Sequence, residues 1–375
     1  MDTDQASSDQ ANATPAPVLA PEPPGPSPRG LEWVFIGPQG LRAGWSVLLA
    51  YCLFYLFRLV IGTIFVTANW VDDRGDYTAV SMLTLESIPF LAMLAAGMII
   101  AFIERRRILD FNLRGPRRGL RFISGLTTGF VALSALIGAL AWGGWLRFGP
   151  PALTGAQILR FAALWGCAFQ LVACVEEGLF RCYLQFTLTR GLTLWWALAA
   201  EIALCLDLAL HVRTHGTWGV YAIALLGLFP CLVLHLKNIR GSAFWQAAWV
   251  TSTFFGMIHT FNGGENWIGI FAAASIGFVF CVSVRVTGSA WWAIGCHAAW
   301  DWTETYFYGT ADSGLPARGH FLTTWPLGNP LLSGGTDGPE GSLLVFGAIL
   351  LLLAGVLTLY ARRGPAAAQS YSVAD

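Results

Sequence analysis

The stretch Cys174-Val175-Glu176-Glu177-Gly178-Leu179-Phe180-Arg181 decides how this chain folds and where its chemistry lies. It places two adjacent carboxylates and a guanidinium inside a run, residues 161–188, that is otherwise largely apolar. Such a run is long enough to cross a bilayer as a helix. Charged side chains inside a membrane helix are costly and usually mark functional positions. The sequence therefore predicts a membrane helix that carries a functional site.

The two carboxylates of this stretch have different surroundings on a helix. Glu177 and Arg181 lie four residues apart and share a face, so they can form an ion pair at membrane depth. Glu176 is rotated away by about 100° and has no partner at helical spacing. We predict that Arg181 holds Glu177 and that Glu176 is free for chemistry. The alternative is that Glu176 forms a hydrogen bond that only joins two helices.

The composition places the chain in a membrane. Hydrophobic residues make up 55% of the 375 residues and charged residues only 12%, which excludes an ordinary soluble domain. The net charge is zero, so nothing indicates a nucleic-acid partner. The eight cysteines lie in apolar segments without a CxxC pair, and we interpret them as packing residues. The predicted fold class is all-α, a polytopic bundle of transmembrane helices.

About ten apolar runs are long enough to span a bilayer as helices. The proline-rich residues 1–30 precede them and are predicted to be a disordered tail without the features of a signal peptide. The expected spans lie at about 45–66, 84–103, 122–142, 158–187, 193–211, 219–236, 243–260, 267–284, 290–308 and 342–360.

Arginine and lysine gather in alternate loops of this layout, above all between Arg105 and Arg121. Cytoplasmic loops carry such an excess, so the pattern predicts that both termini are cytoplasmic. Attraction of the basic loop to anionic lipid is the alternative. No transit or retention signal is visible, which favours the inner (plasma) membrane of a cell as the location.

Two further apolar helices carry histidines. His259 ends the run from Phe254, and a glycine-rich turn follows it. In Cys296-His297-Ala298-Ala299-Trp300-Asp301, His297 and Asp301 lie four residues apart on one face, a spacing that lets a carboxylate orient an imidazole. Two imidazoles and a free carboxylate in a dry cavity suit hydrolysis, because a base or a metal ion must activate water there.

Two mechanisms remain open at this point. In the first, His259 and His297, together with Glu176 or Asp301, bind a divalent metal ion, zinc being the first candidate. In the second, no metal takes part and Glu176 is the base. His259, His297 and Asp301 then hydrogen-bond the developing oxyanion. The sequence has no HExxH motif, so the histidines must converge from separate helices.

The three motifs, in this order, resemble the CAAX protease and bacteriocin-processing family of intramembrane proteases, also called CPBP or ABI. The motifs are Glu176-Glu177-x-x-x-Arg181, Phe255-x-x-x-His259 and His297-x-x-x-Asp301. The resemblance implies peptide-bond hydrolysis in or beside the bilayer, with Glu176 activating water and with Glu177 and Arg181 beside it. It casts His259 and His297 as metal ligands or oxyanion stabilisers. Asp301 stands where many relatives have asparagine, which leaves the question of a metal more open.

The resemblance also implies a substrate and a division of the chain. Eukaryotic relatives trim prenylated CAAX proteins, and bacterial relatives are linked to peptide processing, bacteriocin immunity or the anchoring of other proteins. The expected partners are a hydrophobic or lipidated peptide or protein substrate and membrane lipid. The expected parts are a tail at 1–30, N-terminal helices with a basic loop at 31–121, a catalytic core at 122–308 with an inserted helix pair near 193–236, an extracytoplasmic loop at 309–341, and a last helix with a cytoplasmic tail at 342–375.

Two other functions compete with hydrolysis. A proton-coupled transporter or channel would use Glu176, the histidines and the pair Asp207 and His211 as a relay. A non-catalytic immunity protein would bind a peptide in the same cavity. Asp207 and His211 belong to a second polar set near a helix end, with Glu201 and His215, which we interpret as structural.

Overall fold

The computed structural model of the chain describes residues 32–37, 40–71, 77–191, 219–237, 239, 241–262, 264–314 and 317–360, and single positions between 195 and 210. The predicted tail, most of the expected span at 193–211 and the polar set around Asp207 and His211 lie outside the described residues. The chain divides into two units, Met1–Arg42 and Ala43–Asp375. The first contains a short helix and a hairpin: α1 (Glu32–Phe35), β1 (Ile36–Gly37) and β2 (Gly40–Leu41).

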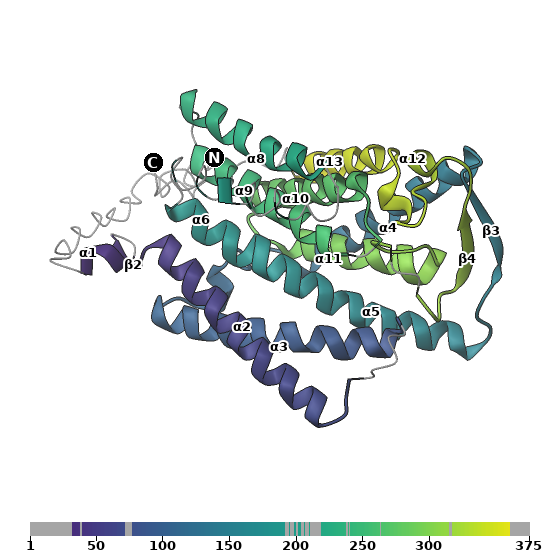
Figure 1. The fold of residues 1–375 in the computed structure, drawn as a ribbon, viewed down its shortest axis with the longest axis horizontal. Helices are drawn as coiled ribbons and strands as arrows, with labels where there is room; N and C mark the ends of the chain where they lie inside the picture. Colours follow the sequence, from purple (N-terminus) through teal and green to yellow (C-terminus); the bar gives the residue numbers. More distant parts are fainter. Residues whose placement is uncertain are drawn as a thin grey trace, which may run out of the picture. The chain divides into compact units, whose positions relative to one another are not determined.

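The second unit is a bundle of helices, which confirms the predicted all-α class (Figure 1). Its helices are α2 (Ala43–Thr67), α3 (Ala79–Ile103), α4 (Arg118–Trp142), α5 (Ala156–Glu177), α6 (Gln185–Gly191), α8 (Gly219–Leu236), α9 (Ser242–Ile258), α10 (Trp267–Thr287), α11 (Trp291–Asp301), α12 (Pro330–Ser333) and α13 (Val345–Tyr360). Shorter elements are η1 (Ile108–Asp110), η2 (Gly178–Leu184), η3 (His259–Phe261), η4 (Trp302–Tyr308) and η5 (Pro339–Gly341), with an antiparallel pair of strands, β3 (Leu146–Pro151) and β4 (Leu322–Pro326).

Five helices among the described residues are long and apolar enough to cross a membrane. They are α2, α3, α4, α10 and the continuous helix Ala156–Gly191, which joins α5, η2 and α6. The expected spans that correspond to α8, α9, α11 with η4, and α13 are also helical, although shorter or interrupted. The protein is therefore a polytopic membrane protein, as its composition predicts.

Both helices that carry site carboxylates change to π-helical hydrogen bonding directly after them. The π segment η2 begins after Glu177, and the π segment η4 begins after Asp301. A π turn holds more residues than an α turn and so redirects the side chains that follow it, and such segments are frequent at functional sites. In Figure 1, α5 runs between α3 and α11, which places the first of these π segments in the middle of the bundle.

Glycines bring α4 and α11 into backbone contact. A Cβ atom at Gly125 or Gly129 of α4 would collide with the carbonyl oxygen of Trp292 or Cys296, respectively. On the other helix, a Cβ at Gly295 would collide with the carbonyl oxygen of Phe122. Glycines four residues apart allow this close approach between membrane helices. The contact holds the backbone of α11 against α4 at Cys296, the residue directly before His297.

We expect Gly129→Ala to destabilise the protein and to disturb the position of His297. The added methyl group has no space against α11, and overpacking of this kind costs about 1–3 kcal/mol. The matched control is Gly138→Ala, because Gly138 lies on the same helix and a Cβ there meets nothing within 4 Å. The control should be as stable as the original protein or more so, by up to about 1 kcal/mol. Thermal unfolding in detergent measures both variants, and equal midpoints would contradict the packing argument.

Candidate active site

A cavity of about 470 Å³ lies among α3, α5, α9, α10 and α11. Four of the predicted site residues line it: Glu176, His259, His297 and Asp301. The other two, Glu177 and Arg181, do not line it and are completely buried. Three distant segments of the sequence thus meet in one cavity. Its remaining walls combine apolar side chains such as Phe169 and Val172 with the further carboxylates Glu86, Asp312 and Glu340.

Glu177 and Arg181 form the ion pair that their spacing predicts. Arg181 Nε lies 3.2 Å from Glu177 Oε2, and both side chains have no exposed surface. The guanidinium carbon also lies 4.2 Å from the centre of the Phe255 ring and 5.4 Å from that of Phe280. The faces of aromatic rings attract a desolvated cation. The ion pair and these rings together stabilise an arginine in the interior.

A glycine on α10 leaves room for this arginine. A Cβ atom at Gly277 would collide with Arg181 Nη2, and it would also crowd the Phe255 ring at 3.2 Å. Asn112, which precedes α4, holds the backbone of the same residue, because its Nδ2 donates to the Arg181 carbonyl oxygen at 2.8 Å. Sequence reasoning missed both residues, since nothing in their local pattern points to Arg181.

His297 is oriented from a different helix. Its Nδ1 donates to Glu177 Oε1 at 2.9 Å, while its Nε2 lies 3.5 Å from Asp301 Oδ2 and 3.8 Å from Glu176 Oε2. Asp301, which was predicted to orient His297, is therefore at ion-pair distance from it. The carboxylate that accepts the hydrogen bond from the ring is Glu177. One carboxylate thus binds Arg181 with one oxygen and His297 with the other, and it joins α5 to α11.

His259 is oriented by its own helix. Its Nδ1 donates to the carbonyl oxygen of Phe255 at 2.7 Å. The Phe255 ring packs near both imidazoles, with its centre 5.0 Å from that of His259 and 6.2 Å from that of His297. This explains why the second motif pairs a phenylalanine with a histidine one turn later. The phenylalanine orients one imidazole, packs against the other and covers Arg181.

Glu176 differs from its neighbour as the sequence predicts. Its side chain retains 27% of its exposure, against none for Glu177, and it faces the cavity. Its Oε2 has no hydrogen-bond partner in the described part of the chain. As predicted, Arg181 holds Glu177, whereas Glu176 Oε2 accepts no hydrogen bond from the described residues.

The predicted metal ligands are His259, His297 and Glu176. Each imidazole donates its Nδ1 proton to an oxygen and keeps Nε2 for another interaction, which is the usual arrangement of metal-ligating histidines. The donor set therefore fits zinc in its chemistry. Among the described residues, however, the group of three whose ligand atoms lie within 4.8 Å of one another is a different one, Glu304, Asp312 and Glu340.

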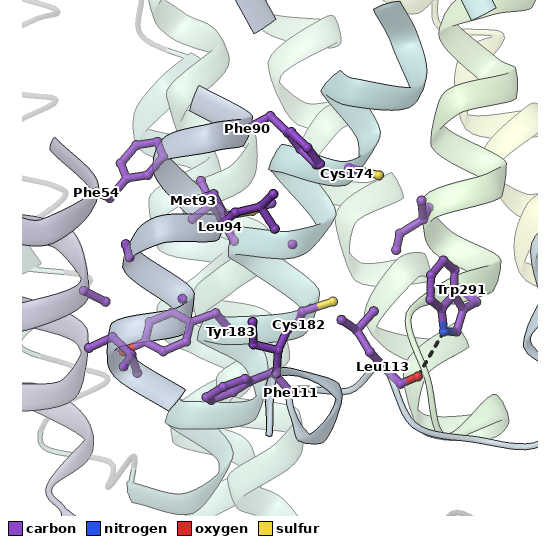
Figure 2. A pocket seen from close by; sticks show the side chains of 18 residues that line it. Phe54, Phe90, Met93, Leu94, Phe111, Leu113, Cys174, Cys182, Tyr183 and Trp291 are labelled. Atoms are coloured by element: carbon purple, nitrogen blue, oxygen red, sulfur yellow. Dashed lines mark hydrogen bonds between the residues drawn. The ribbon is translucent and has the colours of Figure 1, made fainter. Parts of the chain in front are cut away.

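A second cavity of about 210 Å³ lies between α2, α3, η2 and α11 (Figure 2). Its wall is almost entirely apolar, with Phe90, Met93 and Leu94 of α3 facing Cys174 and Cys182. Cys174 is two residues from Glu176 and so points to another face of the helix. This cavity can accommodate hydrocarbon, but it offers no carboxylate or imidazole for hydrolysis.

Comparison with known families agrees with this geometry. Residues 231–303 match the family model described as type II CAAX prenyl endopeptidase Rce1-like. The matched segment includes His259, His297 and Asp301, whereas the motif of Glu176 precedes it and joins it only in the fold. No curated protein and no solved structure matches the chain. The match covers the second and third of the three ordered motifs, and this segment of the chain is similar to the CAAX protease family.

Proposed function

We propose that this protein hydrolyses a peptide bond in a hydrophobic or lipidated peptide, with Glu176 as the base that activates water. One observation carries the proposal: the free carboxylate of Glu176 shares a cavity with two imidazoles whose Nδ1 atoms are already occupied. A base must lie within hydrogen-bond reach of the water that it deprotonates. The 3.8 Å between Glu176 Oε2 and His297 Nε2 places both groups around one small space.

The other site residues have supporting roles in this proposal. His297 and His259 stabilise the negative charge that develops on the carbonyl oxygen of the substrate, each through Nε2 and in its doubly protonated form, because the Nδ1 proton is already donated to Glu177 or to the Phe255 carbonyl. Glu177 is a positioning residue, because its hydrogen bond fixes the ring of His297 while Arg181 neutralises its charge. Asp301 Oδ2 lies 3.5 Å from His297 Nε2 and can accept a hydrogen bond from the protonated imidazole.

A metal version of the mechanism uses the same residues. His259, His297 and Glu176 would hold a zinc ion, with Glu177 and the Phe255 carbonyl as the outer hydrogen-bond partners of the two imidazoles. Bound there, zinc would supply a more acidic water and polarise the scissile carbonyl group. In either version, the protein itself contributes the orientation of the imidazoles and a cavity with restricted access to water.

The surroundings of the site support a hydrophobic substrate. The cavity lies among helices that are long and apolar enough to cross a bilayer, and its walls include Phe169, Val172 and Phe280. A peptide held by a lipid anchor or an apolar segment reaches such a depth, whereas a soluble peptide does not. We also propose that both termini face the cytoplasm of a cell whose inner membrane holds the protein, which labelling of the two termini in sealed vesicles checks.

The test is cleavage by the purified protein in lipid nanodiscs. The substrates are two peptides that end in a CAAX sequence and differ only in a prenyl group on the cysteine. We expect cleavage of the prenylated peptide, detected by mass spectrometry, and little cleavage of the other. Treatment with a chelator, followed by added zinc, separates the two versions: loss and recovery of activity support the metal, and unchanged activity supports the metal-free base. No cleavage over a panel of hydrophobic peptides would overturn the proposal.

A further inference from the structure

Three carboxylates gather beside the cavity, outside the set used for hydrolysis. Glu304 lies on η4, Asp312 follows it in the next loop, and Glu340 lies on η5. Their ligand atoms all lie within 4.8 Å of one another. The group therefore joins a helix of the bundle to both ends of the loop between 309 and 341. Asp312 and Glu340 also line the cavity, whereas Glu304 is buried and does not line it.

Glu304 is the unusual member of this group. Its side chain is completely buried, and neither of its carboxylate oxygens has a hydrogen-bond partner among the described residues. The other two are partly satisfied, since Thr305 Oγ1 donates to Asp312 at 2.9 Å and Trp300 Nε1 donates to Glu340 at 2.7 Å. A buried carboxylate without a donor is strongly destabilising, and two like charges beside it increase the cost.

Two further carboxylates, Glu265 and Asp337, lie close enough to interact electrostatically with the group. Burial, together with the nearby Asp337, raises the pKa of Glu265 to about 8. Burial also raises the pKa of Asp337 to about 7, although the backbone N–H of Asn266 donates to it at 3.0 Å. No arginine or lysine forms an ion pair with the group in the described part of the chain. A bound cation would supply the missing positive charge.

We propose that Glu304, Asp312 and Glu340 form a divalent cation site that takes calcium. The donors are all oxygen atoms, which hard cations prefer, and zinc would favour nitrogen or sulfur. Oxygens on opposite sides of a calcium ion lie about 4.6–5.2 Å apart, given a ligand distance of about 2.3–2.6 Å. The spread of these ligand atoms, within 4.8 Å, fits that geometry. The proposal does not rest on the proposed hydrolysis, because none of these three carboxylates has a role in it.

A cation here would fix one wall of the cavity. Asp312 and Glu340 contribute to that wall, and Glu304 anchors the ion to the helix that continues from Asp301. The loop from 309 to 341 would then be fastened to the bundle at both ends. Removal of the ion is expected to loosen the loop and lower the stability of the whole chain.

The experiment uses the full chain in detergent after removal of divalent ions with EGTA. We expect one radioactive calcium ion to bind per chain and the thermal unfolding midpoint to rise by several degrees with calcium concentration. Glu304→Gln should lose both the binding and the rise. Asp312→Asn should do the same, and this second variant tests the proposal even if Glu304→Gln does not fold.

Two controls separate this site from the proposed catalytic one. Glu86→Gln changes a carboxylate that lines the same cavity but does not belong to the group, and it should keep the calcium response. His259→Ala removes a candidate zinc ligand, and it should keep the response as well. Equal midpoints in EGTA and in calcium, with no bound calcium, would overturn the proposal. A normal response in Glu304→Gln would overturn it too.

Discussion

Replacement of Glu176 by glutamine is expected to reduce peptide cleavage by a factor of about 10²–10⁴, the usual contribution of a general base. The amide has nearly the same shape as the carboxylate but cannot take a proton from water. Glu176 Oε2 has no hydrogen-bond partner among the described residues, so the change should disturb the fold little beyond weakening the 3.8 Å contact with His297 Nε2. The measurement is the initial rate of cleavage of the prenylated peptide, at saturating and at low concentration.

Glu86→Gln is the matched control for this variant. Glu86 lines the same cavity from α3, and its replacement also removes a negative charge, yet it has no role in the proposed chemistry. The control should retain most of the activity, and both variants should unfold at nearly the original temperature. Normal turnover by the Glu176 variant would remove that residue from the mechanism.

Replacement of Glu177 by glutamine should instead damage the fold. Arg181 would remain in the interior without its counter-charge, and breaking a buried ion pair from one side costs about 3–5 kcal/mol. The acceptor at 2.9 Å from His297 Nδ1 would also change from a charged carboxylate oxygen to a neutral amide oxygen, which holds the ring less strongly. Chemical unfolding in detergent should show the loss of stability, and the activity that remains should be low.

The double variant Glu177→Leu with Arg181→Met separates these two effects. Replacing both charges by apolar side chains of similar size often restores stability, so this variant should unfold more like the original protein. It should stay inactive, because leucine cannot accept the proton of His297. A stable and fully active double variant would show that the ion pair has no positioning role.

Much of the fold could be predicted from local patterns. Apolar runs identify membrane helices by length alone, and the structure has helices at nine of the expected spans, the tenth falling outside most of the described residues. The pairing of Glu177 with Arg181 could also be predicted, because both lie on one turn of one helix. The freedom of Glu176 follows from the same periodicity.

Contacts between helices could not be predicted in this way. The sequence indicated Asp301 as the residue that orients His297, since the two share a helix face, but the hydrogen bond comes from Glu177, which lies 120 residues away. Such a contact depends on how the helices pack. The same reason hides Gly277, whose missing side chain makes room for a guanidinium on another helix.

The acidic group at Glu304 was missed for a related reason. Its members lie on η4, in a loop and on η5, and each one alone looks like an ordinary polar residue at a helix end. The loop between 309 and 341 also contains buried residues, since Asp337 is 1% exposed and Gly341 is buried. Loop composition gives no signal of such burial.

The contacts of Glu177 and Arg181 restrict how the cavity can widen. Through His297, Phe255 and Phe280 they tie α5 to α11, α9 and α10, so these four helices can separate only if a buried charge is exposed to lipid. The wall from α3, with Met82 and Leu85, makes no contact of this kind with either charge. We therefore expect a chain arriving from the bilayer to enter beside Met82 and Leu85 of α3, while the C-terminal end of this helix stays held through Glu104 and Arg190.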